Sequence, residues 1–270
     1  MVNEDMRAVA PASPAAGYIG GKRQLARRVV AAVEAVPHTL YAEPFVGMGG
    51  IFLRRRLAPK AEAINDRDRD VATFFRVLQR HYQAFMDMLK WQLTARAEFE
   101  RLRAQDGDTL TDLERAARFL YLQRLSFGGK VAGRSFGVDT TGPARFDTNR
   151  LGPLLEAIHE RMAGVVIECL DWRMFLERWD RPYALFYLDP PYHGTESFYA
   201  AKFPREDHMA LAEALRGLKG RFILTMNDCP ETRKIYRGFE IEGVELSYTA
   251  GGSGKVKRAG EIIVSGGGKR

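Results

Sequence analysis

The sequence predicts an α/β fold: a mostly parallel β-sheet covered by helices and interrupted by a helical insertion. Short apolar runs alternate with helix-like segments towards both ends of the chain, and several runs are apolar throughout, as in strands buried on both faces. The runs expected to form parallel strands are 39–46, 61–65, 165–170, 184–189 and 222–226. The alternation stops between about 71 and 160, which indicates an insertion into the sheet.

The spacing of apolar residues defines the amino-terminal elements. Residues 1–16 are rich in Ala and Pro and show no periodicity, so we expect a flexible tail. Apolar residues recur at helical spacing over 22–36, which predicts the first helix. The strand 39–46 then runs into a glycine-rich turn and a helix-like stretch, and the strand 61–65 ends directly before Asp66.

The middle of the chain is predominantly helical. Long mixed stretches over 71–125 and the amphipathic pattern of 151–162 predict helices. Between them, 126–148 contains glycines, threonines and a proline that suggest loops or a hairpin. The predicted organisation is a flexible tail at 1–16, one discontinuous domain formed by 17–70 and 161–270, and an inserted domain at 71–160.

The carboxyl-terminal part returns to strands. A helix with leucines on one face follows the strand 184–189, and Gly220 is expected to end that helix. The strand 222–226 comes next. The segments 239–250 and 261–264 then predict an antiparallel pair that closes the sheet.

Composition excludes several classes of protein. The chain has 270 residues, 46% hydrophobic and 28% charged, so it is neither disordered nor fibrous. Its two cysteines, Cys169 and Cys229, cannot form a disulfide framework or a four-ligand zinc site. No apolar run is long enough to span a membrane and the amino terminus lacks the apolar core of a secretory signal, so we expect a cytoplasmic protein. The formal net charge of +7 suggests an acidic partner.

The first chemical motif is the sequence EPFVGMGG at 43–50, directly after a strand. Glycines at 47 and 49 allow a tight turn and a close approach of the backbone to a ligand at the carboxyl edge of a parallel sheet. Asp66 follows the next strand, where nucleotide-binding α/β folds place a carboxylate that accepts hydrogen bonds from ribose. A plain strand-to-helix turn, with Asp66 as a helix cap, explains these residues equally well.

The second motif is LDPPY at 188–192, at the end of an apolar strand. Two prolines remove two backbone donors and leave the preceding carbonyls free to accept. Asp189 adds an anionic acceptor and Tyr192 a flat aromatic face, so together they suit a planar amine. Asp189 and the Pro190 carbonyl could hold both amine hydrogens and so expose the nitrogen lone pair. A rigid turn would explain the prolines but not the flanking Asp and Tyr.

The third motif is YIGGK at 18–22, which opens the first predicted helix. It is not a phosphate-binding Walker A loop, because Ala16 and Arg23 stand where that loop needs Gly and Ser or Thr. A helix amino terminus with Lys22 suits a carboxylate ligand. A simple helix cap is an equally good interpretation of this motif alone.

Taken in order, YxGGK, EPFVGxGG, Asn65-Asp66 and DPPY resemble the motifs of the Dam-like, α-group DNA adenine-N6 methyltransferases, and the resemblance covers about 17–264. It implies a Rossmann-like, S-adenosylmethionine-dependent methyltransferase sheet with an inserted helical or hairpin target-recognition domain at 71–160. DPPY alone is shared with other amino-methylating enzymes, whereas the ordered set is more specific. The cofactor-binding residues implied by the resemblance are Tyr18, Lys22, Phe45, Gly47, Gly49, Asp66, Asp171 and Asp189.

The resemblance also implies the reaction. A methyl group would pass from S-adenosylmethionine to the N6 amine of an adenine flipped out of double-stranded DNA. Asp189 would touch cofactor and amine, the Pro190 carbonyl would hold the amine, and Tyr192 would stack on the base. We expect neither a metal nor a covalent nucleophile, so Cys169 and Cys229 are expected to be core residues.

Basic residues in the middle region are candidates for DNA contacts. Arg124, Lys130 and Arg134 lie in or beside the segment that reads bases in the resembled family. A solvated surface charge is the alternative for each of them. Ala132 falls about where GATC-specific relatives carry a base-reading Arg, so GATC specificity is not predicted. A restriction endonuclease partner would be a separate protein, and we expect a monomer or weak dimer.

Three other functions remain open at this stage. A cytosine-N4 methyltransferase would use the same amine chemistry but more often carries Ser-Pro-Pro-Tyr. A glutamine methyltransferase acting on protein would carry Asn-Pro-Pro-Tyr. A catalytically silent DNA-binding module would have no need of both Asp66 and Asp189.

Overall fold

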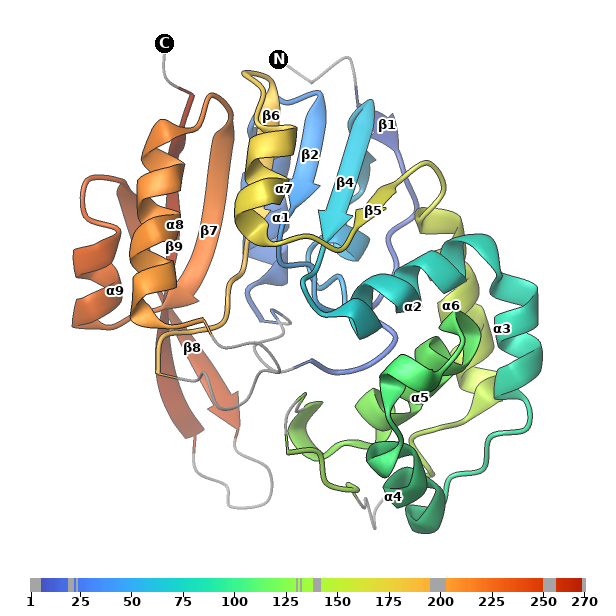
Figure 1. Cartoon of the computed structure of the whole chain (residues 1–270). Coiled ribbons are helices and arrows are strands. Elements are labelled where there is room, and N and C mark those ends of the chain that lie inside the picture. Colours follow the sequence, from blue (N-terminus) through green and yellow to red (C-terminus); the bar gives the residue numbers. More distant parts are fainter. Residues whose placement is uncertain are drawn as a thin grey trace.

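A computed structural model describes residues 6–18, 22, 24–129, 131, 133–137, 142–194, 203–249 and 256–268. A seven-stranded sheet lies at its centre, with helices on both faces and a separate group of helices at the lower right of Figure 1. The predicted α/β class with a helical insertion is therefore confirmed. None of the helices that the structure describes has the length and apolar character needed to cross a bilayer.

Five strands of the sheet are parallel, as predicted. They are β2 (Leu40–Glu43), β4 (Ala61–Asn65), β5 (Val166–Glu168), β6 (Ala184–Leu188) and β7 (Arg221–Asn227). The predicted antiparallel pair is also present, as β8 (Glu240–Thr249) and β9 (Val256–Gly267). The strand order is β5-β4-β2-β6-β7-β9-β8, so β9 lies between β7 and β8.

The strand order reverses between β2 and β6. From β2 the chain builds outwards through β4 to β5, and it then returns to the other side of β2 to add β6 and β7. At such a switch point, the loops that leave two adjacent strands diverge to opposite sides, which opens a crevice at the carboxyl ends of the strands. This topology determines where a ligand can bind.

Side chains alternate between the two faces of the sheet, and each face has its own core. Tyr41 and Tyr187 face α1 (Ala26–Ala35) and the inserted helices. Ala42 and Phe186 face α7 (Trp172–Trp179), α8 (Arg205–Gly217) and α9 (Pro230–Ile235). Helices α7 and α9 were not predicted from the sequence, because a helix of eight residues or fewer offers little periodicity to detect.

The part of the insertion that the structure describes contains five α-helices and two short 3-10 turns. The helices are α2 (Arg69–Arg80), α3 (Tyr82–Leu89), α4 (Arg96–Ala104), α5 (Asp112–Leu125) and α6 (Thr148–Arg161). The 3-10 turns are η1 (Phe52–Arg54), η2 (Gly107–Thr109) and η3 (Phe127–Gly129), of which η1 precedes the insertion. Asp68 caps α2 and a Thr111–Glu114 capping box begins α5, so polar side chains satisfy the first free N–H groups of both helices.

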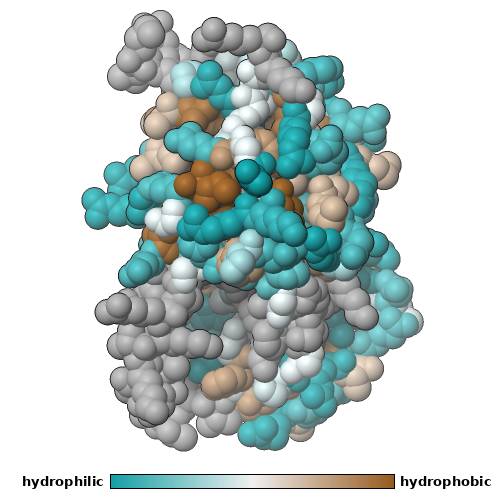
Figure 2. Space-filling model, turned by 90° about the vertical axis from the view of Figure 1, so that its left-hand side faces the viewer, coloured by the Kyte–Doolittle hydropathy of each residue, from teal (hydrophilic) through white to brown (hydrophobic). Residues whose placement is uncertain are grey.

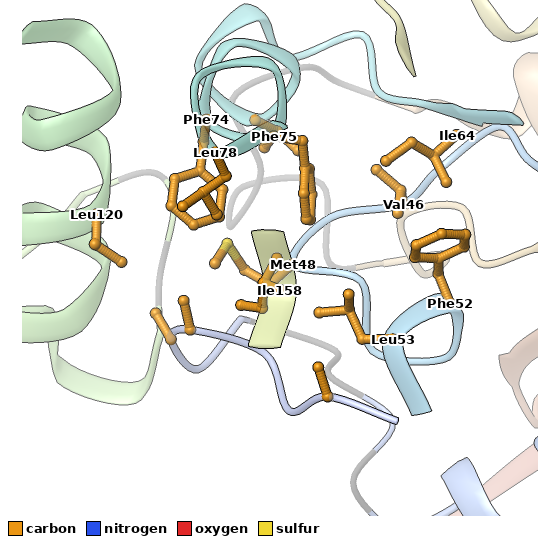
Figure 3. Close-up of a cluster of buried hydrophobic side chains, with 14 of the residues drawn as sticks. Val46, Met48, Phe52, Leu53, Ile64, Phe74, Phe75, Leu78, Leu120 and Ile158 are labelled. Carbon is orange, nitrogen blue, oxygen red and sulfur yellow. The ribbon is translucent and has the colours of Figure 1, made fainter. Parts of the chain in front are cut away.

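The insertion and the sheet share one hydrophobic core. Figure 3 shows side chains of the glycine-rich turn, such as Met48, beside Phe74 and Phe75 of α2 and Ile158 of α6. The expected boundaries at 70/71 and 160/161 fall inside α2 and at the end of α6. The insertion and the sheet therefore share buried contacts, and the division into two domains stays a prediction.

The flexible tail expected over 1–16 is wrong for residues 6–16. Strand β1 (Arg7–Ala8) pairs with β3 (Leu57–Ala58), and Ala15 is fully buried. Alanine side chains are small enough to pack closely against the core without any helical or strand periodicity, which is why the pattern was missed. Residues 1–5 lie outside the described residues.

Three smaller expectations also fail. β5 is an edge strand with Val166 exposed, so the run 165–170 is not covered on both faces. Cys169 beyond it is exposed, and Cys229 is only partly buried, so neither is a full core residue. α8 ends at Gly217 rather than at Gly220.

The exposed surface is mainly hydrophilic on the face shown in Figure 2. That face, on the side of α8 and α9, shows a small brown area surrounded by teal.

Among the residues that the structure describes, no group of three or more His, Cys, Asp or Glu side chains is placed to hold a metal ion.

Candidate active site

A cavity of about 530 Å³ opens at the switch point between β2 and β6. This volume is within the usual range for sites of small ligands and cofactors. The cavity brings together residues of all three sequence motifs. The predicted cofactor-binding residues in its lining are Tyr18, Lys22, Phe45, Gly47, Asp66 and Asp189.

The glycine-rich turn after β2 has the tight geometry that the sequence predicted. Gly47 and Gly49 have φ angles of 50° and 74°, which side-chain-bearing residues rarely adopt. A Cβ on Gly49 would lie 2.9 Å from Cγ of Leu53, so no side chain fits there. Gly47 lines the cavity, whereas Gly49 shapes the turn from beneath, against Leu53 and Phe75.

Asp66 lies at the carboxyl end of β4 and faces the glycine turn. Its Oδ2 accepts the N–H of Gly47 at 2.9 Å, and its Oδ1 accepts the N–H of Asp68 at 2.9 Å. Burial, reinforced by the neighbouring Asp68 carboxylate, raises the pKa of Asp66 to about 7. The side chain is thus held rigidly at the cavity wall, and near neutral pH it is divided between its neutral and ionised forms.

Asp189 at the end of β6 forms an ion pair with Lys22. The ammonium Nζ lies 2.7 Å from Oδ1 of Asp189, and Thr225 of β7 donates its hydroxyl to the same oxygen at 3.0 Å. Burial raises the pKa of Asp189, although the Lys22 ammonium and the Thr225 hydroxyl oppose the shift. Tyr187 hydrogen-bonds Thr225 at 2.8 Å, which fixes the orientation of that hydroxyl. The motif at 18–22 therefore meets the motif at 188–192 through a charged contact.

Tyr192 lies beside this ion pair. The Lys22 ammonium is 4.4 Å from the centre of the Tyr192 ring, a favourable cation–π arrangement. Burial and the nearby Asp189 and Glu261 carboxyls raise the pKa of Tyr192 well above its ordinary value, so its hydroxyl stays protonated. Pro190, which follows Asp189 in the motif, is buried.

Glu43 is a site residue that the sequence analysis did not single out. It ends β2, lines the cavity and accepts the hydroxyl of Tyr41 at 2.5 Å. Burial raises its pKa to about 8, so it is mostly protonated at neutral pH. Its position at the start of the 43–50 motif could have marked Glu43 as a site residue. Its burial, which raises its pKa, could not be predicted, because it depends on the neighbouring strands.

Aromatic rings form one wall of the cavity. Phe45 packs edge-to-face on Phe203 with ring centres 5.6 Å apart, and Trp172 lies 6.3 Å from the same ring. Phe45 was predicted from the motif. Trp172 and Phe203 were not, because they come from the start of α7 and the segment before α8.

Asp171 does not reach the site in the described structure. It caps α7 by accepting the N–H of Arg173 at 3.0 Å, and its other oxygen lies 4.0 Å from Arg67. Its neighbours Leu170 and Trp172 are part of the described cavity lining, whereas Asp171 is not. Its cofactor contact stays a prediction that the geometry does not favour.

The basic residues expected to meet DNA have different surroundings. Arg124 lines the cavity and donates to the carbonyls of Arg145 at 3.0 and 2.7 Å and of Ala15 at 2.8 Å. Arg134 donates to Gln123 at 3.2 Å, and burial lowers its pKa. Lys130 and Ala132 lie outside the described residues.

Comparison with known proteins gives a consistent result. Residues 18–250 match the sequence model of a family described as D12 class N6 adenine-specific DNA methyltransferases. The chain is 26% identical to the type II methyltransferase M1.LlaDCHI of Lactococcus lactis subsp. cremoris, over 93% of this chain and 94% of that protein. It is 26% identical to the DNA adenine methylase of Vibrio cholerae serotype O1, over 78% and 81% of the two chains. It is also 26% identical to the DNA N-6-adenine-methyltransferase of Escherichia phage P1, over 74% of this chain and 28% of that protein.

The matched residues contain all three motifs that meet at the cavity and run through both halves of the sheet and the whole insertion. The chain belongs to the D12 class of N6 adenine-specific DNA methyltransferases and is an S-adenosylmethionine-dependent enzyme that acts on adenine in DNA.

Proposed function

We propose that the switch-point cavity binds S-adenosylmethionine and that Asp189, Pro190 and Tyr192 hold the target adenine at its edge. The observation that carries this proposal is the meeting of Lys22, Asp66 and Asp189, which come from three distant parts of the chain, around one cavity. A ligand with both cationic and anionic groups and a ribose suits such a set of charges.

The chemistry of the cavity residues fits the cofactor. The Asp66 carboxylate is an acceptor for ribose hydroxyls, and the ammonium of Lys22 suits the carboxylate of the methionine part. Phe45 and Trp172 offer flat apolar surfaces for the adenine ring, and Tyr18 covers Gly47 beside them. When bound, S-adenosylmethionine supplies a methyl group on a positively charged sulfur.

The chain's own residues prepare the amine. Asp189 accepts one N6 hydrogen, and a backbone carbonyl before Pro190 or Pro191 accepts the other, because neither proline competes with a backbone N–H. The nitrogen lone pair then faces the cavity. No residue needs to form a covalent bond, so catalysis arises from positioning and from the negative field of Asp189.

Asp189 gains a further donor during this cycle. Its Oδ1 already accepts from Lys22 and Thr225, and the incoming amine is a third donor to the same carboxylate. Movement of the Lys22 ammonium towards the cofactor would make the Asp189 carboxylate a stronger acceptor for the amine. The affinity of the site for adenine is therefore expected to depend on the cofactor.

The target adenine must leave the DNA stack to reach this site, at a cost of a few kcal/mol. Tyr192 offers a stacking surface for the extruded base. We propose that 71–160 forms the target-recognition domain and that Lys130 and Arg134 contribute to DNA binding, with Arg124 in a supporting position at the cavity.

A separate restriction endonuclease of matching specificity is the partner we infer. The relative from Lactococcus lactis is named a type II methyltransferase, which supports this context. We further propose that the chain acts as a monomer or weak dimer, which size-exclusion chromatography with light scattering would measure.

The test replaces Asp189 with alanine. Asp189→Ala should lower methyl transfer to duplex DNA by at least about 100-fold, while S-adenosylhomocysteine still binds. Asp87→Ala is the matched control, because Asp87 is exposed on α3 and pairs with Lys90. Sequencing of modified adenines in the product DNA identifies the recognition site. Methylation at an undiminished rate by Asp189→Ala would overturn the assignment of Asp189.

A further inference from the structure

A buried amide joins the cofactor motif to the loop that precedes Arg134. Gln123 of α5 is only 1% exposed, and its Nε2 donates to the carbonyls of Gly17 and Gly129 at 2.8 Å each. Its Oε1 accepts from Arg134 at 3.2 Å. Both donor hydrogens and the acceptor of this amide are engaged, so its three partners are held in one arrangement.

The two backbones joined by this amide are also in direct contact. Gly129 has φ +67°, and a Cβ on it would lie 3.0 Å from both C and O of Gly17 and 3.1 Å from N of Tyr18. No side chain fits between them. The segment that carries Tyr18 therefore lies directly on the 127–129 turn.

On its other side, Tyr18 contacts the glycine turn of the cavity. A Cβ on Gly47 would lie 3.2 Å from Cε1 of the tyrosine ring, and the N–H of Gly47 is bonded to Asp66. A continuous path of contacts thus runs from Gly129 through Tyr18 to the cofactor wall. Closely packed groups of this kind move together rather than independently.

Two backbone hydrogen bonds close the base of the segment that contains this turn. The N–H of Phe127 bonds the carbonyl of Ser135 at 3.0 Å, and that of Gly137 bonds Leu125 at 2.7 Å. The Phe127 side chain at this base is exposed. A ligand that contacts Phe127 therefore acts on a turn whose inner edge, at Gly129, rests on Gly17.

We propose that Gln123 is a positioning residue that couples DNA bound at the insertion to the cofactor site, so that each ligand raises the affinity for the other. This inference rests on the proposed function, which places DNA at the insertion and the cofactor beside Tyr18. DNA held against the insertion would further restrain Gln123 and, through its hydrogen bond to Gly17, the segment that carries Tyr18, which lowers the ordering cost of the second ligand. Linkage requires the effect to be equal in both directions.

The experiment measures the dissociation constant of S-adenosylhomocysteine by calorimetry, with and without a short duplex that contains the methylation site. In the unaltered enzyme the duplex should tighten binding by about five-fold or more. Gly129→Ala should bring this ratio close to one, because the added methyl group collides with the backbone of Gly17. Gly128→Ala is the matched control: Gly128 also has φ +67°, but its Cβ would meet nothing within 4 Å, so the ratio should persist.

Gln123→Met gives a second, independent test, because it keeps the length of the side chain and removes all three hydrogen bonds. It should raise the KM for the cofactor on DNA by about five-fold or more and leave kcat within two-fold. If Gln123 only stabilises the fold, Gln123→Met will lower the melting temperature but leave unchanged the ratio of the S-adenosylhomocysteine dissociation constants measured without and with the duplex.

The possible results distinguish a failure of the coupling from a failure of the proposed function. If both ligands bind but the unaltered enzyme shows a ratio of one, the coupling is wrong and the proposed function stands. If Gly128→Ala and Gly129→Ala abolish the tightening by the duplex equally, the contact between Gly129 and Gly17 does not transmit the coupling and the inference is overturned. If S-adenosylhomocysteine does not bind at all, the proposed cofactor site and the coupling fail together.

Discussion

The carboxyl edge of the sheet and the inserted helices use charged residues in opposite ways. At the sheet edge, Asp66 and Asp189 face a cavity and carry pKa values raised by burial. In the insertion, Arg124 and Arg134 donate hydrogen bonds to carbonyls and a side-chain amide of the same chain. Charge in a sequence thus indicates a site most reliably where strand topology determines the side to which it points.

The contact between these two regions is itself charged. Arg161 at the end of α6 donates to both carboxylate oxygens of Glu62 on β4, at 2.8 and 2.7 Å. Arg55 binds the same carboxylate and lies 3.5 Å above the ring of Tyr41. Burial raises the pKa of Glu62, but the two guanidinium groups more than reverse this and lower it overall. The two halves are therefore joined by a buried network as well as by the shared apolar core.

The largest expected effect comes from the ion pair within the site. Lys22→Met should lower methyl transfer by about 100-fold or more, because it leaves Asp189 buried without its counter-charge and removes a proposed cofactor contact. Radiolabelled methyl incorporation measures the loss. Lys90→Met, which breaks an exposed pair with Asp87, should change the rate less than two-fold. Equal rates for the two variants would mean that the sheet edge and the surface of the insertion do not differ as described.

The junction between the regions should dominate stability. Arg161→Met should lower the free energy of unfolding by about 3–5 kcal/mol, because Glu62 loses a bidentate partner while remaining buried. Urea denaturation followed by circular dichroism measures this change. Arg150→Met removes an exposed arginine of the same helix, paired with Asp147, and should cost less than about 0.5 kcal/mol. A small loss in Arg161→Met would show that the apolar core alone holds the halves together.

The sheet edge should respond to pH. Asp66 has a pKa of about 7, and ribose hydroxyls bond best to its ionised form, so cofactor affinity should fall as the pH drops below 7. Binding of S-adenosylhomocysteine is expected to be roughly tenfold weaker at pH 6 than at pH 8. Asp66→Asn should bind more weakly and lose this dependence. Glu43→Gln, which removes the neighbouring group of pKa about 8, should retain it between pH 6 and 7. Parallel pH profiles for Asp66→Asn and the unaltered enzyme would contradict the assignment.

The smallest effect concerns Asp171, which the sequence placed at the cofactor and the structure uses as a helix cap. Asp171→Ala should cost about 1 kcal/mol of stability through loss of the cap on α7. Its dissociation constant for S-adenosylhomocysteine should stay within two-fold of the original. A tenfold weaker constant would instead restore the prediction made from the sequence.

The fold was largely predictable because buried parallel strands have a simple signature. Strand β4 was predicted to the residue, and the closing pair β8–β9 was predicted in type and order. The cavity lining was predictable where a motif directly follows the carboxyl end of a buried strand, as at Gly47 and Asp189. Glu43, Trp172 and Phe203 were not, because each reaches the cavity only through the packing of elements distant in the sequence.

The position of β9 inside the sheet has a consequence for synthesis. Translation reaches β9 after all the other strands, yet it pairs with β7 on one side and with β8 on the other. Until it emerges from the ribosome, the edge of β7 is left without its partner and is open to pairing with other nascent chains. A product released before residue 256 would keep that edge and should be captured by chaperones or aggregate.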